Sequence, residues 1–209
     1  MAGCGCNAPC ETNKTISPRF RKALWIALFV NASMFVVEVI AGATSGSVSL
    51  WADSLDFAGD AANYAISLAV LGMSLSWRST AALFKGLTMA AFGLFVLGKA
   101  GWSYFQGIPP EAITMGIIGF IALLANAGVA VLLYTFRDGD ANMRSVWLCS
   151  RNDAIGNIAV MLAALGVMGT ASVIPDLIVA VIIAGLGLSS GISVIKQARQ
   201  ELKSRYSEA

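Results

Sequence analysis

Three aspartates stand close together in a stretch that is otherwise apolar enough to be buried in a membrane. Asp53, Asp56 and Asp60 lie at positions i, i+3 and i+7 of the sequence SVSLWADSLDFAGDAAN, residues 47–63. This spacing places all three carboxylates on one face of a helix. Because an ionised side chain in hydrocarbon costs about 2.5–3.5 kcal/mol, that face must meet a protein interior, a cavity or a cation. The stretch therefore predicts a metal or proton site.

A second stretch, residues 147–160, offers a matching set of polar side chains. Its sequence is WLCSRNDAIGNIAV, in which Cys149, Asp153 and Asn157 follow one another at four-residue spacing. The first stretch likewise has a potential ligand, Asp56, then an aspartate four residues later and an asparagine about one turn beyond. We expect the two stripes to face each other from two helices.

Two ligands from each helix complete the set of four that a tetrahedral divalent ion prefers. We therefore predict a metal site formed by Asp56, Asp60, Cys149 and Asp153. The alternative for each stripe is a polar seam whose side chains only hydrogen-bond one helix to another. Carboxylates inside a membrane are usually functional, which favours the metal site.

The composition is that of a membrane protein. The 209 residues are 57% hydrophobic and 12% charged, and the mean hydropathy is +0.73. Soluble globular domains are less apolar, so the chain is predicted to be polytopic. At about 20 residues per crossing, it has room for six helices and short loops but not for a separate soluble domain. Histidine is absent, so any metal site must use carboxylate, thiolate or amide ligands.

We predict an all-α fold of six transmembrane helices within residues 19–199, between a disordered tail at 1–18 and a short polar tail at 200–209. The lysines and arginines outside the helices lie almost entirely in the N-terminal segment, the second and fourth links and the C-terminal tail. By the positive-inside rule, both termini are cytoplasmic. Basic residues thus mark membrane edges, and no stretch suggests nucleic-acid binding. The helices are expected at 22–43, 47–74, 80–105, 111–136, 143–168 and 171–196.

The N-terminal tail carries three cysteines, Cys4, Cys6 and Cys10. In a reducing cytoplasm, disulfides between them are disfavoured. The cluster is a candidate for capturing soft metal ions, and three incidental cysteines in a disordered tail are the alternative. Because no apolar run precedes Cys4, lipidation of this residue is not expected.

Further polar side chains lie inside the apolar runs. Asp53 and Glu38 are candidates for the ion path or for contacts with the metal ligands, with a purely structural role as the alternative. Asn63 and Asn157 either support the ligands or form hydrogen bonds between helices, and the second interpretation is slightly favoured. Lys85 is a candidate for pairing with a carboxylate of a neighbouring helix or subunit.

The run VVEVIAGATSGSVSLWADSLDFAGD, residues 36–60, resembles the first two helices of the cation diffusion facilitators. The shared pattern is a glutamate (here Glu38), a glycine, Ser-Gly-Ser, Ala-Asp and a His-or-Asp-x3-Asp pair. Cys149-x3-Asp153 is similar to the family's pair in the fifth helix, except that its first ligand differs. The chain stops shortly after its last helix, so we expect a short form without the family's C-terminal cytoplasmic domain.

The resemblance implies a homodimeric exporter of Zn2+ or a similar divalent ion, exchanged for protons by alternating access. Asp56, Asp60, Cys149 and Asp153 would form the transport site. It implies no cofactor beyond the transported ion and no enzymatic activity. Without any organelle signal, a bacterial inner membrane is the simplest location.

Chemistry adds two expectations to this resemblance. Carboxylates that lie close together cannot all stay ionised without a cation, so protons and metal compete for the same oxygens. A thiolate is a soft ligand, so Cys149 favours Zn2+ or Cd2+ over Mg2+, Ca2+ or Mn2+. Two alternatives stay open: Cys149 as a buried packing residue, and a membrane-embedded metal sensor or metalloenzyme that uses the same site.

Overall fold

The computed structural model of the chain describes the backbone of residues 18–69, 75–136 and 141–206. It describes the side chains of these ranges except at 75–79, 81, 141–149, 201–202 and 204–206. The described residues form an all-helical fold, which confirms the predicted class. The six helices are α1 (Pro18–Ser45), α2 (Val48–Ala69), α3 (Leu75–Gln106), α4 (Ala112–Tyr134), α5 (Ala141–Thr170) and α6 (Ile174–Tyr206).

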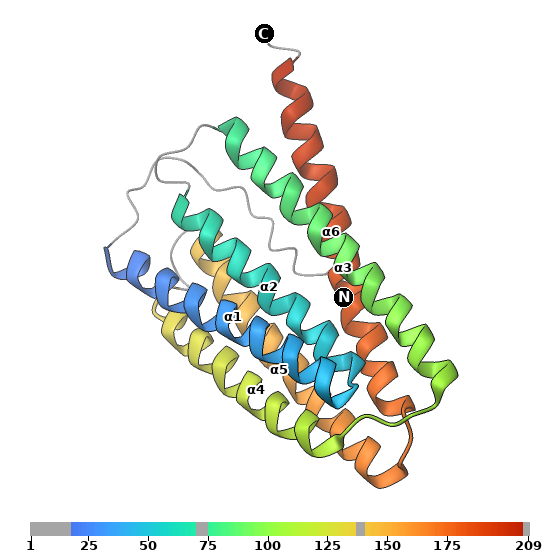
Figure 1. The fold of residues 1–209 in the computed structure, drawn as a ribbon. Helices are drawn as coiled ribbons and strands as arrows, with labels where there is room; N and C mark the ends of the chain where they lie inside the picture. Colours follow the sequence, from blue (N-terminus) through green and yellow to red (C-terminus); the bar gives the residue numbers. More distant parts are fainter. Residues whose placement is uncertain (1–17, 70–74, 137–140, 207–209) are drawn as a thin grey trace.

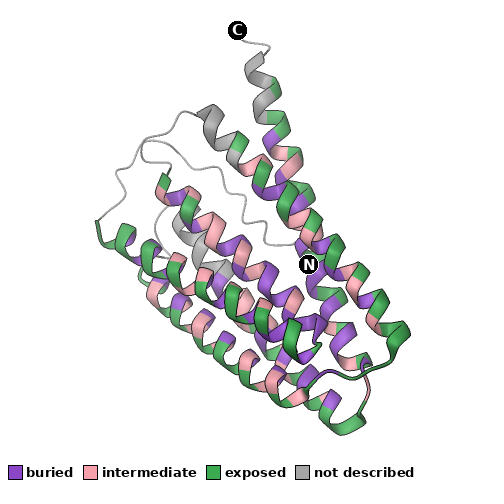
Figure 2. Ribbon diagram, in the orientation of Figure 1, coloured by how far each residue is buried: buried purple, intermediate pink, exposed green. Residues whose placement is uncertain are grey.

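The outer surface of the helices is apolar, as a lipid-facing surface must be. Five of the helices contain segments long and apolar enough to cross a membrane, and α2 differs from them by carrying three aspartates. Figure 2 shows exposed residues along the outward faces of the helices, and many of these are large and apolar, including Phe29, Phe84, Val131 and Leu165. Lipid tails solvate such side chains, so the chain is a multi-pass membrane protein.

Some helix ends differ from those predicted. Helix α6 continues to Tyr206, so residues 200–206 of the predicted polar tail are helical. The segment KQARQELKSRY consists mainly of residues that favour helix, and charge alone did not end the helix. Helix α3 begins at Leu75, five residues before the predicted start at 80, and α1 begins at Pro18, a residue type that suits the first turn.

The helices form two groups (Figure 1). Helices α3 and α6 lie side by side along one side of a bundle made by α1, α2, α4 and α5. The α3–α6 contact depends on glycines: a Cβ added to Gly191 would lie 3.0 Å from the Ala90 backbone nitrogen and 3.1 Å from the Gly86 carbonyl oxygen. Small residues of this kind let two membrane helices approach closely. Helix α2 contacts α1, α3, α5 and α6, so it lies where the two groups meet.

The start of α2 is held by the start of α6. The Asp176 carboxylate accepts hydrogen bonds from the Val48 and Ser49 backbone N–H groups, at 2.7 and 3.1 Å, and from the Ser47 hydroxyl at 2.7 Å. The first N–H groups of a helix have no partner within the helix, and a carboxylate there also interacts favourably with the helix dipole. Asp176 thus fixes α2 to α6 at the end where α2 begins.

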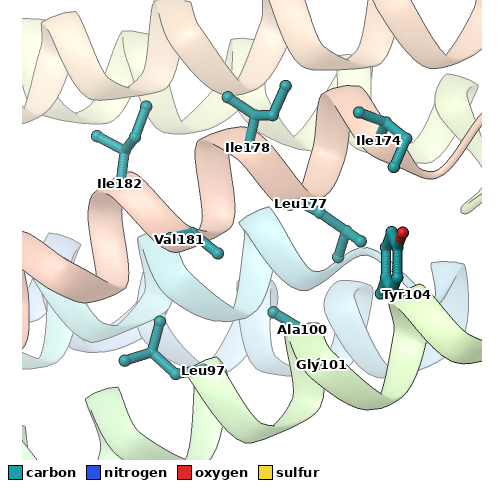
Figure 3. A pocket seen from close by; sticks show the side chains of 9 residues that line it. All are labelled: Leu97, Ala100, Gly101, Tyr104, Ile174, Leu177, Ile178, Val181 and Ile182. Carbon is teal, nitrogen blue, oxygen red and sulfur yellow. The ribbon is translucent and has the colours of Figure 1, made fainter.

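A shallow apolar groove of about 570 Å³ runs between α3 and α6. Figure 3 shows Tyr104 beside Leu177 at one end of the groove, while Ile174, Ile178 and Ile182 follow one another along α6. None of the side chains that line it is charged. The groove therefore belongs to the lipid-facing surface and offers no ligand to an ion.

Candidate metal-transport site

A layer of polar side chains crosses the bundle between two apolar clusters. One cluster, here called the link-side cluster, lies where α1 joins α2, α3 joins α4 and α5 joins α6, and includes Val48, Val160 and Leu177. The other, the far-side cluster, includes Phe20 and Leu133. The buried Asn31 and Glu38 of α1, Asp53 and Asp60 of α2, and Asn126 of α4 fall between the two clusters along their helices, and Asn157 of α5 lies before the link-side residue Val160. Among the described residues, the polar layer is thus flanked by apolar clusters, the link-side one built from all six helices and the far-side one from α1, α2 and α4.

Asp60 of α2 and Asp153 of α5 meet within this layer. Their carboxylates lie within hydrogen-bonding reach of each other. The Tyr64 hydroxyl donates to Asp60 Oδ2 at 2.9 Å and lies 2.8 Å from the Ser150 hydroxyl of α5. Two acidic oxygens from different helices thus face each other, with a phenol at the far-side edge.

The other two predicted ligands lie one helical turn away on the same two helices. Asp56 precedes Asp60 by four residues, is partly buried, and acts electrostatically on Asp153. Cys149 precedes Asp153 by four residues on α5, and its side chain lies outside those described. Within the described part of the chain, no three His, Cys, Asp or Glu side chains gather closely enough to hold a metal ion. Four-fold ligation therefore stays a prediction.

A chain of hydrogen bonds links Asp53 to two amides. The Asn157 side-chain N–H donates to Asp53 Oδ2 at 2.6 Å, and the Asn126 side-chain N–H donates to Asn157 Oδ1 at 2.9 Å. This chain joins α2, α5 and α4. Asn157 thus forms hydrogen bonds to α2 and α4, which agrees with its interpretation as a residue that links helices.

Glu38 of α1 is fully buried in the same layer. Neither of its carboxylate oxygens meets an N–H or O–H donor among the described residues. The side chain instead lies against Asp53. Asn31, two turns earlier on α1, donates to the Ala27 carbonyl at 2.8 Å, and its own Oδ1 also meets no donor in the described structure.

Asn63 and Lys85 form a contact between α2 and α3. The Lys85 ammonium donates to Asn63 Oδ1 and also acts electrostatically on Asp60. Asn63 therefore contacts a cationic side chain and lies one turn beyond Asp60. The candidate residues Cys4, Cys6 and Cys10 lie outside the described residues.

Three residues of the site were not among those predicted. Asn126 is buried in an otherwise apolar helix, which is the signal that points to it. Tyr64 follows Asp60 by four residues, so helical spacing places it on the same face. Ser150 offers no comparable signal, because serine is common in membrane helices and hydrogen-bonds its own backbone.

Comparisons with known proteins give a consistent result. The profile of a family described as the cation efflux transmembrane domain matches residues 24–203. The chain is 26% identical over 194 residues to the zinc transporter ZitB of Pectobacterium atrosepticum, covering 87% of this chain and 61% of that protein. It is 25% identical over 194 residues to a cadmium, cobalt and zinc/H(+)-K(+) antiporter of Bacillus velezensis, covering 85% and 61%. The chain therefore spans about three-fifths of the length of these relatives.

Proposed function

Because the chain belongs to the cation efflux family, a family of transporters and not of enzymes, we propose that it exports Zn2+ or Cd2+ in exchange for protons. The observation that carries this proposal is the contact between Asp60, which is buried, and Asp153, which is partly buried, two carboxylates of different helices in a layer that lies between two apolar clusters. The names of the relatives, a zinc transporter and a cadmium, cobalt and zinc antiporter, support the choice of ions.

The transported ion would bind to Asp56, Asp60, Cys149 and Asp153. Cys149 and Asp153 share one face of α5, and Asp56 and Asp60 share one face of α2, because residues four apart on a helix are neighbours. Three oxygens and one sulfur suit a borderline-soft ion that accepts four ligands. Hard ions such as Mg2+ or Ca2+ prefer six or more oxygens and are poorly served by this set.

Proton exchange follows from the contact between the two aspartates. Two ionised carboxylates this close repel each other, so a proton or a cation must reduce their charge. Arrival of a divalent ion then displaces protons, and arrival of protons weakens the hold on the ion. The Tyr64 hydroxyl donates to Asp60 in either case and so orients that carboxylate.

Alternating access would require the two apolar clusters to part in turn. With both termini cytoplasmic, as the positive charges predict, the far-side cluster would close the site toward the cytoplasm and the link-side cluster would close it toward the outside. A hydrated ion cannot pass through either apolar cluster, so each cluster must open in turn for the ion to be exchanged.

The family resemblance also implies a homodimer. Light scattering on the purified protein tests this oligomeric state.

The test is ion uptake into proteoliposomes that contain a metal-sensitive dye and a pH dye. We expect Zn2+ and Cd2+ to enter with opposite movement of protons, and Mn2+ to be excluded. Asp60→Asn and Asp153→Asn should each abolish the flux. Glu111→Gln is the matched control, because Glu111 is an exposed carboxylate at the start of α4.

Cys149→Ser tests the sulfur ligand in the same assay. A serine hydroxyl is a hard ligand, so uptake of Cd2+ should fall more than uptake of Zn2+. Unchanged Cd2+ uptake would show that the thiol is not a ligand. If the wild type binds the ion stoichiometrically without moving it, and Asp60→Asn loses that binding, the protein is a sensor and the transport proposal is wrong.

A further inference from the structure

The proposed metal ligands leave one buried acidic side chain unexplained. Glu38 is fully buried on α1, and no described N–H or O–H group donates to either of its oxygens. An ionised carboxylate in such a position is very unfavourable unless a cation or a proton compensates it. The residues around Glu38 must therefore supply one or the other.

The facing helices supply a second carboxylate and no cation. Asp53 of α2 lies against Glu38 and is itself buried, and Asp56 lies farther along the same helix. On the metal-site side, Asp53 acts electrostatically on Asp153 of α5. Among the described residues of α4 that enter the polar layer, Asn126 is neutral.

The charged groups on the remaining neighbours of α2 have other partners. The ammonium of Lys99, on α3, lies 5.7 Å from the centre of the Trp51 ring, and Lys85 donates to Asn63. Asp176 of α6 binds the first N–H groups of α2. The groups that act on Glu38 and Asp53 include neither these lysines nor a described arginine, so no described cation balances this pair.

The neighbouring amides show where the pair of carboxylates needs a hydrogen atom. Asn126 donates to Asn157 Oδ1, so the Asn157 amide must turn its N–H toward Asp53 Oδ2. Asp53 therefore receives one donor from α5 and lies against Glu38 on α1. Two carboxylates that meet in this way need one hydrogen between them, since two like charges in contact cannot both persist.

We propose that Glu38 and Asp53 form a proton-binding site, separate from the metal ligands, which holds one proton between the two carboxylates. This inference rests on the proposed function, because it names a site for one of the exchanged protons. When the proton leaves, the O–H bond of the pair breaks, the proton passes to water on the open side, and the pair changes from one negative charge to two.

The position of the pair couples it to the metal. Asp53 precedes Asp56 by three residues, which is about 4.5 Å along a helix axis. A divalent ion at Asp56 therefore adds positive charge within one turn of the pair without displacing Glu38 or Asp53. The ion favours the doubly negative pair, so its binding releases the proton, and return of the proton favours release of the ion.

The experiment measures protons released per Zn2+ bound, by calorimetry of the reconstituted full chain in buffers of different ionisation enthalpy. Glu38→Gln cannot exchange a proton, so we expect it to bind Zn2+ and to release one proton fewer per ion than the wild type. Glu111→Gln, a change of the same type at an exposed site, should release as many as the wild type. Equal release by Glu38→Gln and the wild type would overturn the proposal.

Infrared spectroscopy of the metal-free protein tests the bound proton without any transport. The carbonyl stretch of a protonated carboxylic acid should weaken in Glu38→Gln and in Asp53→Asn, and the second variant serves if the first does not fold. A stretch unchanged in both variants would overturn the proposal. If the wild type moves no Zn2+ at all, the proposed function is wrong. The infrared result would still decide whether Glu38 and Asp53 hold a proton.

Discussion

Replacing Asp176 by alanine should destabilise the protein strongly, because this side chain satisfies the buried start of α2. Asp176 accepts hydrogen bonds from two backbone N–H groups, those of Val48 and Ser49, and both of these residues are 0% exposed. Alanine would leave both donors without an acceptor. The Ser47 hydroxyl loses its partner too, but it keeps a contact of 3.2 Å with the Ser49 hydroxyl.

The expected loss follows from the two backbone donors. An unsatisfied buried N–H group costs about 1–3 kcal/mol, so two cost about 2–6 kcal/mol. A helix cap exposed to water is worth only about 0.5–2 kcal/mol, because water replaces the lost acceptor there. Asp176→Asn retains one acceptor oxygen, so it should lose about half of what alanine loses.

Reversible unfolding in mixed micelles measures the free energy of unfolding of each variant. Glu111→Ala is the matched control: Glu111 also lies at the start of a helix, as the N-cap residue of α4, but it is exposed and its side chain does not cap the helix. We expect a change below about 0.5 kcal/mol for this control. If Asp176→Ala destabilises the protein no more than Glu111→Ala does, Asp176 does not hold the start of α2 to α6.

Two further predictions concern the site and the helix pair. Tyr64→Phe removes the hydroxyl that donates to Asp60, and loss of such a supporting hydrogen bond should weaken Zn2+ binding about 10–100-fold in titration calorimetry; an unchanged affinity would refute the orienting role. Gly191→Ala places a Cβ 3.0 Å from the Ala90 nitrogen and should destabilise the protein by about 1–3 kcal/mol in chemical unfolding. Gly185→Ala, also on α6, meets nothing within 4 Å and should not destabilise it.

The helices could be predicted from the sequence because each is a long, mostly apolar run with few charged residues, bounded by turn residues or charges. Their ends were less predictable. The segment after residue 196 was expected to leave the helix because it is charged, yet α6 continues to Tyr206. Charge marks where a helix leaves the membrane, whereas the helix itself ends only where the backbone loses its hydrogen bonds.

Helical spacing also accounts for much of the polar layer. Asp56 and Asp60 fall on one face by their position in the sequence, as do Cys149 and Asp153. The partners of Glu38 did not follow from spacing, because they depend on how α1 is rotated against α2. The contact of Asp176 with Val48 spans 128 residues, and no local pattern signals it.

The short connection between α1 and α2 has a consequence for biosynthesis. Helix α1 ends at Ser45 and α2 begins at Val48, so the ribosome delivers the two helices almost together. Alone, α2 would carry three aspartates into lipid, at about 2.5–3.5 kcal/mol each, long before α5 and α6 are made. As a hairpin with α1, it enters the membrane behind an apolar helix that shields one of its faces. The two-residue link therefore makes insertion of the most polar helix depend on one of the most apolar.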